Sequence, residues 1–487
     1  MKRIIQPTRD ATSVSSRLPL LLPLLLPLLL ASIGAGIGCG GEPAAEASLP
    51  NVVLIIGDTF RADKLSSQGG PEGLTPYLDR MAAEGVRFEV ARSHAPWTLP
   101  STASLLTSLH PSEHGAGGRL PNFTQMGENV KTIAARFKAS GYDTHAVVNV
   151  DFLDPRAFGV TRDFDEVDNV SYASNVDVRA ADATTDAALA WLDQRGDSER
   201  PFFLMVHYFD PHCVYAPPEL QRKRWAEPAD RETDWTFGTR GEMEAIRAGE
   251  LTPGEATLRR AEALYDGEIA YLDAQIGRLD DGILARTESD ELVTVFTSDH
   301  GEEFYDHQGF EHGHTLFEEL VRVPLIVRAP GRLAAGSVVT SAVRHIDVAP
   351  TLCELADIAI EAQYVGQSLV PLVGDAGAVD RGTLAHGNFW AKPLTSWTKD
   401  GWKLIELEAQ GETQGESQRA ALRLYHVKED PLEGQDLAAE EPERLAAMVA
   451  ELADVREGLR ALKAGDRAEL SAAMRAKLSG LGYGDGK

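Results

Sequence analysis

A threonine that stands just before a predicted helix is the first candidate for chemistry in this chain. Thr98 precedes Pro100 and Ser101, and good helix formers follow as far as Thr107. Because proline is favoured in the first helical turn and serine near the cap, we predict that a helix begins here. The unpaired N–H groups of that turn, with the helix dipole, would form an anion site beside the Thr98 hydroxyl. A nucleophile beside an anion site suits ester hydrolysis at sulfur or phosphorus, although ordinary helix capping gives the same pattern.

Four apolar, β-branched runs each end at polar side chains that can bind a metal or an anion. The runs span residues 51–57, 144–148, 202–206 and 292–298. The polar residues that follow them are, in chain order, Asp58; Asn149; His207, Asp210 and His212; Asp299 and His300. Such runs are typical of parallel strands covered on both faces, and ligands of open α/β sheets gather at the carboxyl ends of the strands. We therefore expect these residues to converge, although they lie far apart in the sequence.

A series of short motifs runs in order along the chain from about residue 50. The motifs are NVVLIIGDT at 51–59, TPYLDR at 75–80, PS at 100–101 with LLT at 105–107, GYDT at 141–144, DPH at 210–212, SDHG at 298–301, HGHT at 312–315, RVP at 322–324, WKLI at 402–405, LY at 424–425 and DP at 430–431. Together they resemble the sulfatases of the alkaline phosphatase superfamily. The resemblance implies an α/β fold, with a mostly parallel central sheet flanked by helices and a small C-terminal α+β subdomain.

The resemblance also implies a metal site. Its ligands would be Asp58, Thr98, Asp299 and His300, and an imidazole among them favours zinc or manganese over calcium, which prefers oxygen ligands. Calcium, as in sulfatases, is the alternative ion. A second metal site is an alternative use of Asp210, His212 and His314.

Further residues receive roles in the reaction from the same motifs. His212 and His314 are candidate catalytic groups, and the candidate substrate-binding residues are Arg61, Asn149 and His312. Pairing with Asp63 is an equally good interpretation of Arg61. We interpret His207 as an ordinary buried core histidine and Cys213 as a small buried filler.

The chain departs from the sulfatase pattern at positions that matter for the chemistry. Thr98 stands where sulfatases have the cysteine or serine that is oxidised to formylglycine, and Thr102 stands where they have arginine. Asn149 and Asp151 replace a lysine and a histidine. Threonine cannot form formylglycine by that route, but it is the nucleophile of related phosphodiesterases and headgroup transferases, and a divalent cation lowers the pKa of a hydroxyl. We therefore expect phosphate esters to be better substrates than aryl sulfates.

These observations predict a metal-dependent hydrolase of sulfate or phosphate esters, acting on a small molecule or on a glycan or lipid ester. One alternative is a transferase that moves a phospho-headgroup onto an envelope glycan or lipid. Another is a non-catalytic relative that binds anionic glycans at the cell surface. A net charge of −27 over 487 residues argues against a nucleic-acid partner.

The N-terminal residues predict export. Basic residues precede a leucine-rich run at 18–30, and small residues lead to Cys39, which is typical of a bacterial signal peptide and resembles a lipobox. We therefore expect a signal peptide at 1–38, a tether at 39–50, a catalytic domain at 51–378 and a C-terminal subdomain with a helical tail at 379–487. The protein would lie in the bacterial cell envelope, facing the periplasm or the exterior, and would contact the membrane only through this N-terminal anchor. An ordinary cleaved signal peptide or a retained anchor helix is the alternative.

Four other segments give local expectations. Residues 75–88 predict an amphipathic helix that buries Leu78, Met81 and Ala82. Residues 219–260 are charged and without apolar periodicity, so we expect a variable insertion near the rim of the site. Residues 410–418 predict a hairpin loop, and 437–478 predict helices whose charges form a solvated face.

Overall fold

The computed structural model describes most of the chain after the predicted signal peptide and tether. The described residues are 49–119, 122–169, 179–196, 198–226, 237–247, 249–287, 291–375, 379–387, 389, 393–407, 421–460, 462 and 465–479. The predictions for residues 1–38, for Cys39 and for the loop at 410–418 lie outside them. Within the described residues, no helix is both long enough and apolar enough to cross a bilayer.

The fold is built on a large central sheet, as predicted. In the described residues this sheet has nine strands, with the order β10-β2-β9-β6-β1-β5-β3-β4 and with β11 beside β2. Their bounds are β1 Asn51–Gly57, β2 Val86–Arg92, β3 Asp143–Val148, β4 Glu166–Asn169, β5 Phe202–Tyr208, β6 Leu292–Ser298, β9 Arg322–Arg328, β10 Ser337–Val339 and β11 Val343–Arg344. β1 runs parallel to both β5 and β6, whereas β9 is antiparallel to β6 and β2. The four apolar runs are thus strands of a mostly parallel sheet.

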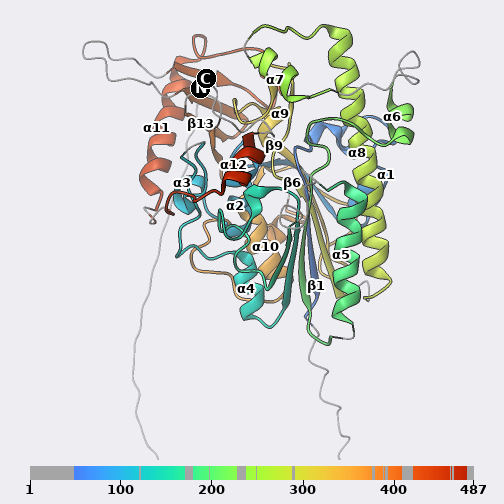
Figure 1. Ribbon diagram of the computed structural model, residues 1–487. Helices are drawn as coiled ribbons and strands as arrows, with labels where there is room; N and C mark the ends of the chain where they lie inside the picture. Colours follow the sequence, from blue (N-terminus) through green and yellow to red (C-terminus); the bar gives the residue numbers. More distant parts are fainter. Residues whose placement is uncertain are drawn as a thin grey trace, which may run out of the picture. The chain divides into compact units, whose positions relative to one another are not determined.

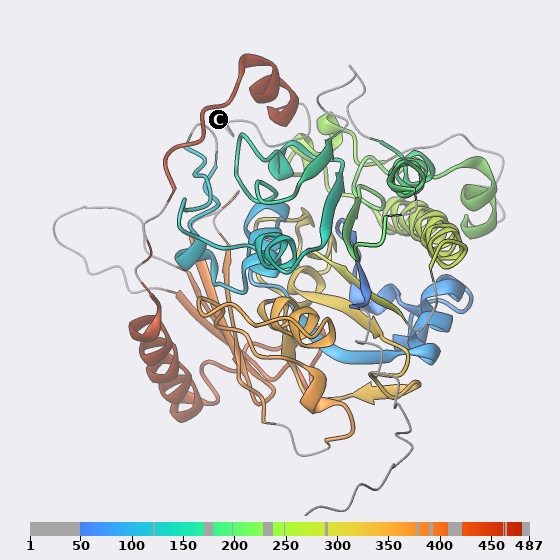
Figure 2. The same ribbon diagram turned by 90° about the horizontal axis from the view of Figure 1, so that it is seen from below.

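Helices cover both faces of this sheet (Figure 1, Figure 2). Alternate residues of β1 belong to two separate cores: Val52, Leu54 and Ile56 to one, and Val53 and Ile55 to the other. The first core includes residues of α2 Thr98–Thr107, α4 Ile133–Ala139 and α10 Val348–Leu355, and the second includes residues of α1 Pro76–Glu84, α5 Ala181–Arg195 and α8 Glu255–Leu284. The two-residue period of a strand thus buries both faces of β1.

The bounds of one predicted helix need correction. The amphipathic helix buries Leu78, Met81 and Ala82 as expected, but it ends at Glu84 and β2 begins at Val86. Gly85 allows this change, since a Cβ there would lie 2.5 Å from the Val327 carbonyl oxygen of β9. In the described part of the charged segment 219–260, the structure has α6 Glu219–Trp225, α7 Arg240–Arg247 and the start of α8, and Phe237, Met243 and Ile246 are buried.

A second, smaller sheet follows in the chain. Its strands are β12 Thr383–Gly387, β13 Leu394–Lys399, β14 Trp402–Leu407 and β15 Ala421–Tyr425, all antiparallel. α11 Pro442–Gly458 buries Met448 and Leu452 in a shared cluster with Leu404 and Leu424. This sheet and α11 confirm the predicted small C-terminal α+β unit.

The tail after α11 returns to the large sheet's side of the molecule. Gln125 N donates to Asp466 O at 3.0 Å, and Ala468 N donates to Phe123 O at 2.8 Å. α12 Ala472–Leu478 then follows, and its Leu478 is fully buried in the core that contains α2. In Figure 1 this helix, in red, lies apart from the other C-terminal helix, α11. The tail therefore packs as part of the catalytic unit.

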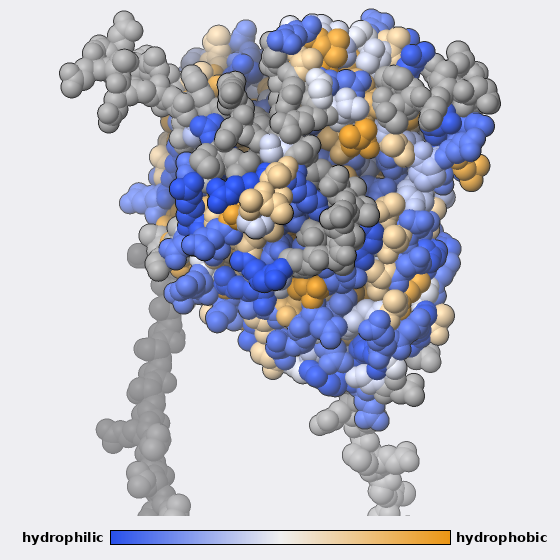
Figure 3. Space-filling view, in the orientation of Figure 1, coloured by the Kyte–Doolittle hydropathy of each residue, from blue (hydrophilic) through white to orange (hydrophobic). Residues whose placement is uncertain are grey.

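The surface agrees with the acidic composition. On the face shown in Figure 3, hydrophilic residues predominate and apolar side chains lie in small separate groups.

A buried ion cluster joins the two sheets. Glu318, in α9 Glu318–Val321, lies 2.9 Å from Arg92 Nη2 of β2 and 3.1 Å from Lys403 Nζ of β14. Lys403 Nζ also lies 3.0 Å from Glu433 Oε1, and all four side chains are buried. Burial opposes ionisation of Glu318, but Arg92 and Lys403 lower its pKa well below the usual range. The cluster thus couples the small sheet to the large one.

We expect Glu318→Gln to lower the free energy of unfolding by about 3–5 kcal/mol, because Arg92 would stay buried without its carboxylate and Lys403 would keep only Glu433. Asp193→Asn, which removes the exposed partner of Arg286, is the matched control and should cost less than about 1 kcal/mol. Because the pKa of Glu318 is lowered by folding, its contribution is present above about pH 4.3 and is lost as the pH falls. Urea unfolding at pH 7 and pH 4 measures both effects; equal stability of the two variants would contradict this role.

Candidate metal centre and active site

The carboxyl ends of β1 and β6 bring three predicted metal ligands together. The two strands pair in parallel with Gly57 opposite Ser298, so Asp58 and Asp299 follow at the same edge of the sheet. His300 comes next, and its Nε2 lies 3.6 Å from Asp58 Oδ1 and 3.4 Å from Asp299 Oδ2. All three side chains are fully buried, and among the described residues they form the one group of three His, Cys, Asp or Glu side chains spaced to share a metal ion.

In this triad, hydrogen-bond acceptor atoms of Asp58, Asp299 and His300 face one another. His300 Nδ1 lies 2.9 Å from the Gly301 carbonyl oxygen, which can only accept, so Nδ1 carries the proton and Nε2 presents a lone pair. Neither oxygen of Asp58 has a hydrogen-bond partner in the described structure, and neither does Asp299 Oδ2. Burial, with Asp299 and Glu302 nearby, raises the pKa of Asp58 well above its usual value. Against the effect of burial, His300, His207 and two backbone N–H groups lower the pKa of Asp299.

Such a set of buried acceptors fits a divalent cation. Three buried carboxylate oxygens without a hydrogen-bond donor are costly, because each has lost its hydration, and the His300 Nε2 lone pair faces two of them. A cation at this point satisfies them and lets both carboxylates ionise side by side. This triad is thus where the chain can hold the metal ion that the sequence resemblance implies.

Thr98 lies at the same centre. It is the first residue of α2, it is 1% exposed, and its Oγ1 lies 3.4 Å from His300 Nε2. A hydrogen bond holds α2 against the β6 end of the site, because Ser101 Oγ donates to the Asp299 carbonyl oxygen. The helix predicted from the Pro100–Ser101 pattern is thus confirmed, and it presents the threonine hydroxyl to the candidate metal ligands.

His207 also lies at this centre, which differs from its interpretation as an ordinary core histidine. Its Nε2 lies 3.5 Å from Asp58 Oδ2, and neither ring nitrogen has a hydrogen-bond partner in the described structure. Burial lowers its pKa to about 4, so the ring is neutral at pH 7. The sequence held a signal for this position, because His207 lies near the end of an apolar run. β1 and β5 pair with Ile56 opposite His207, which places His207 near Asp58 at the end of β1.

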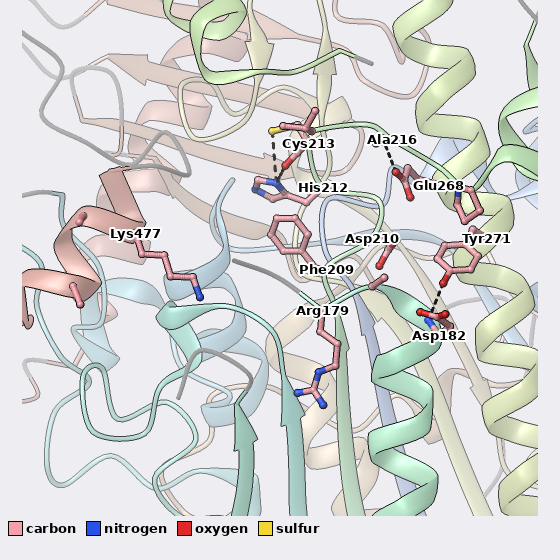
Figure 4. A pocket seen from close by; sticks show the side chains of 15 residues that line it. Arg179, Asp182, Phe209, Asp210, His212, Cys213, Ala216, Glu268, Tyr271 and Lys477 are labelled. Carbon is pink, nitrogen blue, oxygen red and sulfur yellow. Dashed lines mark hydrogen bonds between the residues drawn. The ribbon is translucent and has the colours of Figure 1, made fainter. Parts of the chain in front are cut away.

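A pocket of about 930 Å³ opens beside this centre (Figure 4). Its lining includes Phe209, Asp210, His212, Glu268 and Lys477. The His212 ring lies 4.9 Å from the ring of His312, which lies 4.4 Å from the ring of His300. His312 therefore stands between the pocket wall at His212 and the buried candidate metal ligands, which do not line the pocket themselves.

The two pocket-side histidines are held by their neighbours. His212 Nδ1 bonds the Cys213 carbonyl oxygen at 2.7 Å, and burial together with His312 lowers the pKa of His212 to about 3. His312 Nδ1 lies 2.9 Å from Glu302 Oε1, and Tyr215 donates to the other oxygen of Glu302 at 3.0 Å. His212 is therefore neutral at pH 7 and suits hydrogen bonding to a substrate. Cys213 beside it is buried, as predicted.

Two predicted substrate-binding residues are engaged elsewhere. Arg61 is paired with Asp63 and Asp306 and donates to the Glu302 carbonyl oxygen, which agrees with its alternative, structural interpretation. The Asn149 side chain bonds Thr184, the His207 carbonyl oxygen and Arg179. Both side chains brace the loops around the site.

The predicted second metal site is not formed by the described residues. His314 Nε2 bonds Glu303 Oε2 at 2.7 Å, and this contact raises the pKa of His314 despite burial. Asp210 shares a hydrogen bond with Glu268 on the pocket wall. Asp210, His212 and His314 therefore do not meet the spacing that a shared ion requires.

The sequence comparisons agree with this geometry. The family model described as "Sulfatase" matches residues 50–358, and the model described as "N-sulphoglucosamine sulphohydrolase, C-terminal" matches residues 306–460. An arylsulfatase of Clostridium perfringens is 28% identical over 399 residues, which cover 69% of this chain and 81% of the relative.

Solved structures with the same fold include a complex with a sulfated sugar and a phosphonate monoester hydrolase. BT4656 in complex with its substrate D-glucosamine-2-N,6-O-disulfate superposes with a TM-score of 0.68 at 22% identity, covering 84% of this chain and 98% of that one. The phosphonate monoester hydrolase of Agrobacterium radiobacter superposes with a TM-score of 0.65 at 21% identity, covering 84% and 96%. Since the sulfatase model spans more than half of the residues, the chain belongs to the sulfatase family of the alkaline phosphatase superfamily and is a sulfatase-like ester hydrolase.

Proposed function

We propose that the protein is an exported, metal-dependent hydrolase that prefers phosphate esters to sulfate esters and uses Thr98 as its nucleophile. The observation that carries this proposal is the position of the Thr98 hydroxyl, buried at the start of α2 and 3.4 Å from His300 Nε2. The substrate would be a small-molecule, glycan or lipid ester. The arylsulfatase and the phosphonate monoester hydrolase among the similar proteins support esters of sulfur and of phosphorus as substrates.

The chain's own residues supply the groups that the reaction needs. Thr98 Oγ1 would attack phosphorus and form a covalent ester while its proton passes to solvent water, and the alcohol would leave with the bonding electron pair and take a proton from solvent. Water would then cleave the Thr98 ester, releasing phosphate and restoring the Thr98 hydroxyl. Asp58, Asp299 and His300 would hold the cation, with His207 beside them. When bound, that cation supplies a lowered hydroxyl pKa and positive charge for the ester oxygens. His212 lines the pocket as a neutral hydrogen-bonding group.

The preference for phosphate follows from charge. A phosphate monoester carries more negative charge than a sulfate ester and depends more strongly on a cation and on charge-assisted contacts. Threonine at position 98 excludes the formylglycine route of sulfatases, while the candidate metal ligands are all present. The site thus keeps the groups that favour a phosphate ester.

Thr98→Ala should lower kcat/KM for a phosphate ester by at least about a hundredfold, because nucleophilic assistance is lost. Thr98→Ser should restore part of the rate, since it restores the hydroxyl. Thr107→Ala makes the same change at the other end of α2, where the hydroxyl donates to the Ala103 carbonyl oxygen, and should keep wild-type activity. Rates are measured with matched nitrophenyl phosphate, phosphonate and sulfate esters, and mass spectrometry of quenched enzyme detects a modified Thr98. A fully active alanine variant, or faster hydrolysis of the sulfate than of every phosphorus ester, would refute the proposal.

Export is a proposal that rests on the sequence of residues 1–39. Replacing Cys39 by Ser should move the protein from the membrane fraction to the soluble exported fraction, because the lipid-bearing thiol would be absent. Fractionation of cells that express the full chain measures this, with the wild-type protein as control. Wild-type protein that is found wholly in the soluble exported fraction would argue against a lipid anchor.

A further inference from the structure

The C-terminal helix forms one wall of the active-site pocket. Ala473, Ala476 and Lys477 of α12 line the pocket, and their spacing of three and four residues places them on one face of the helix. Met474 and Leu478 lie on the neighbouring side of the helix and pack in the main core. The helix therefore turns a small-residue face with one lysine toward the pocket.

The segment that leads to α12 is firmly attached to the catalytic unit. Thr124 pairs with Arg467 in an antiparallel bridge, between the hydrogen bonds that Gln125 and Phe123 make to residues 466 and 468. Ser471 caps the helix by accepting from Met474 N at 3.1 Å. These contacts fix the position of Lys477 relative to the pocket.

The Lys477 ammonium group has N–H donors available for a ligand. Its side chain is 16% exposed, and in the described residues its charged neighbour is Asp151, whose Oδ2 lies 3.8 Å away. That distance is too long for a hydrogen bond, and Asp151 Oδ2 is buried without a hydrogen-bond partner in the described structure. An ammonium group can donate three hydrogen bonds.

The other strong cation of the pocket lining is already occupied. Arg179 donates to Asn149 Oδ1 at 3.0 Å and to Asp168 Oδ2 at 3.0 Å. Figure 4 shows the Arg179 side chain turned away from His212, whereas Lys477 extends from α12 toward the side of Phe209 and His212. Among the described lining residues, Lys477 is therefore the strong cation best placed to meet an anionic ligand.

We propose that Lys477 is a substrate-binding residue that donates hydrogen bonds to an oxyanion of the substrate in this pocket. This inference rests on the proposed ester hydrolysis. The oxyanion is either the ester group itself or a second acidic group on the leaving alcohol. Asp151 would hold the ammonium group in place, and the C-terminal tail would complete the substrate site rather than only cover the surface.

Kinetics of the metal-loaded full chain separate these two sources of the oxyanion. The probes are p-nitrophenyl phosphate, whose ester group is its sole anion, and an aryl phosphate that also carries a carboxylate. Lys477→Gln should raise KM by roughly tenfold or more, the size expected when a charge-assisted hydrogen bond is lost, while Lys477→Arg should retain most of the affinity. A rise with both esters assigns the contact to the ester group, and a rise with the carboxylated ester alone assigns it to a second anion.

Two further variants exclude a purely structural role. Arg475→Gln removes the same charge from an exposed position of the same helix and should leave KM unchanged. The double variant with Lys477→Gln and Asp151→Asn removes both charges together. Recovery of wild-type KM in the double variant, or no difference between Lys477→Gln and Arg475→Gln with either ester, would overturn the inference and leave Lys477 as the charge partner of Asp151.

Calorimetric titration with inorganic phosphate makes this test independent of turnover. If the wild-type protein hydrolysed neither ester, the proposed function would fail. Weaker binding of phosphate, or of the carboxylated aryl phosphate in a parallel titration, by Lys477→Gln than by Arg475→Gln would still support the contact, and equal binding of both probes by the two variants would overturn it. Thermal unfolding of each variant confirms that the fold is retained.

Discussion

Four buried acceptor atoms that face one another constrain the whole catalytic unit. Asp58 and Asp299 leave the sheet at neighbouring positions because β1 and β6 pair in parallel register, and His300 points its lone pair at both carboxylates. Without a cation this arrangement is unfavourable, so the apolar strands behind it must hold the loops in place. The same constraint explains why Thr98 has to enter at the start of a buried helix: a flexible loop would not keep its hydroxyl against these charges.

The parts of the chain that follow the large sheet are tied to it by two different interactions. The small sheet is joined through the buried charges of Arg92, Glu318 and Lys403, which need one another to offset their loss of hydration. The tail is joined by backbone hydrogen bonds and by Leu478 in the main core. Because of this second attachment, a segment remote in sequence contributes a wall of the pocket.

The sequence predicted those features that follow from local pattern and parallel-sheet geometry. Strand ends located Asp58, Asp299 and His300, and helix-start chemistry located Thr98. It did not predict the role of Lys477, because the tail pattern alone does not show which side of α12 faces the pocket. The sequence also did not show that Arg61 and Asn149 contact other protein side chains. Their partners, Asp306 and Arg179, come near them through tertiary packing, which the sequence pattern does not show.

Metal content tests the central claim most directly. The purified protein is dialysed against chelator, reloaded with zinc, manganese or calcium in turn, and analysed by mass spectrometry beside Asp299→Ala and the exposed-site control Asp281→Asn. We predict about one equivalent of a bound ion in the wild type and the control, and its loss in Asp299→Ala, because one of the converging carboxylates is removed. Undiminished metal in Asp299→Ala, or full hydrolytic activity in protein that holds no metal, would contradict the account.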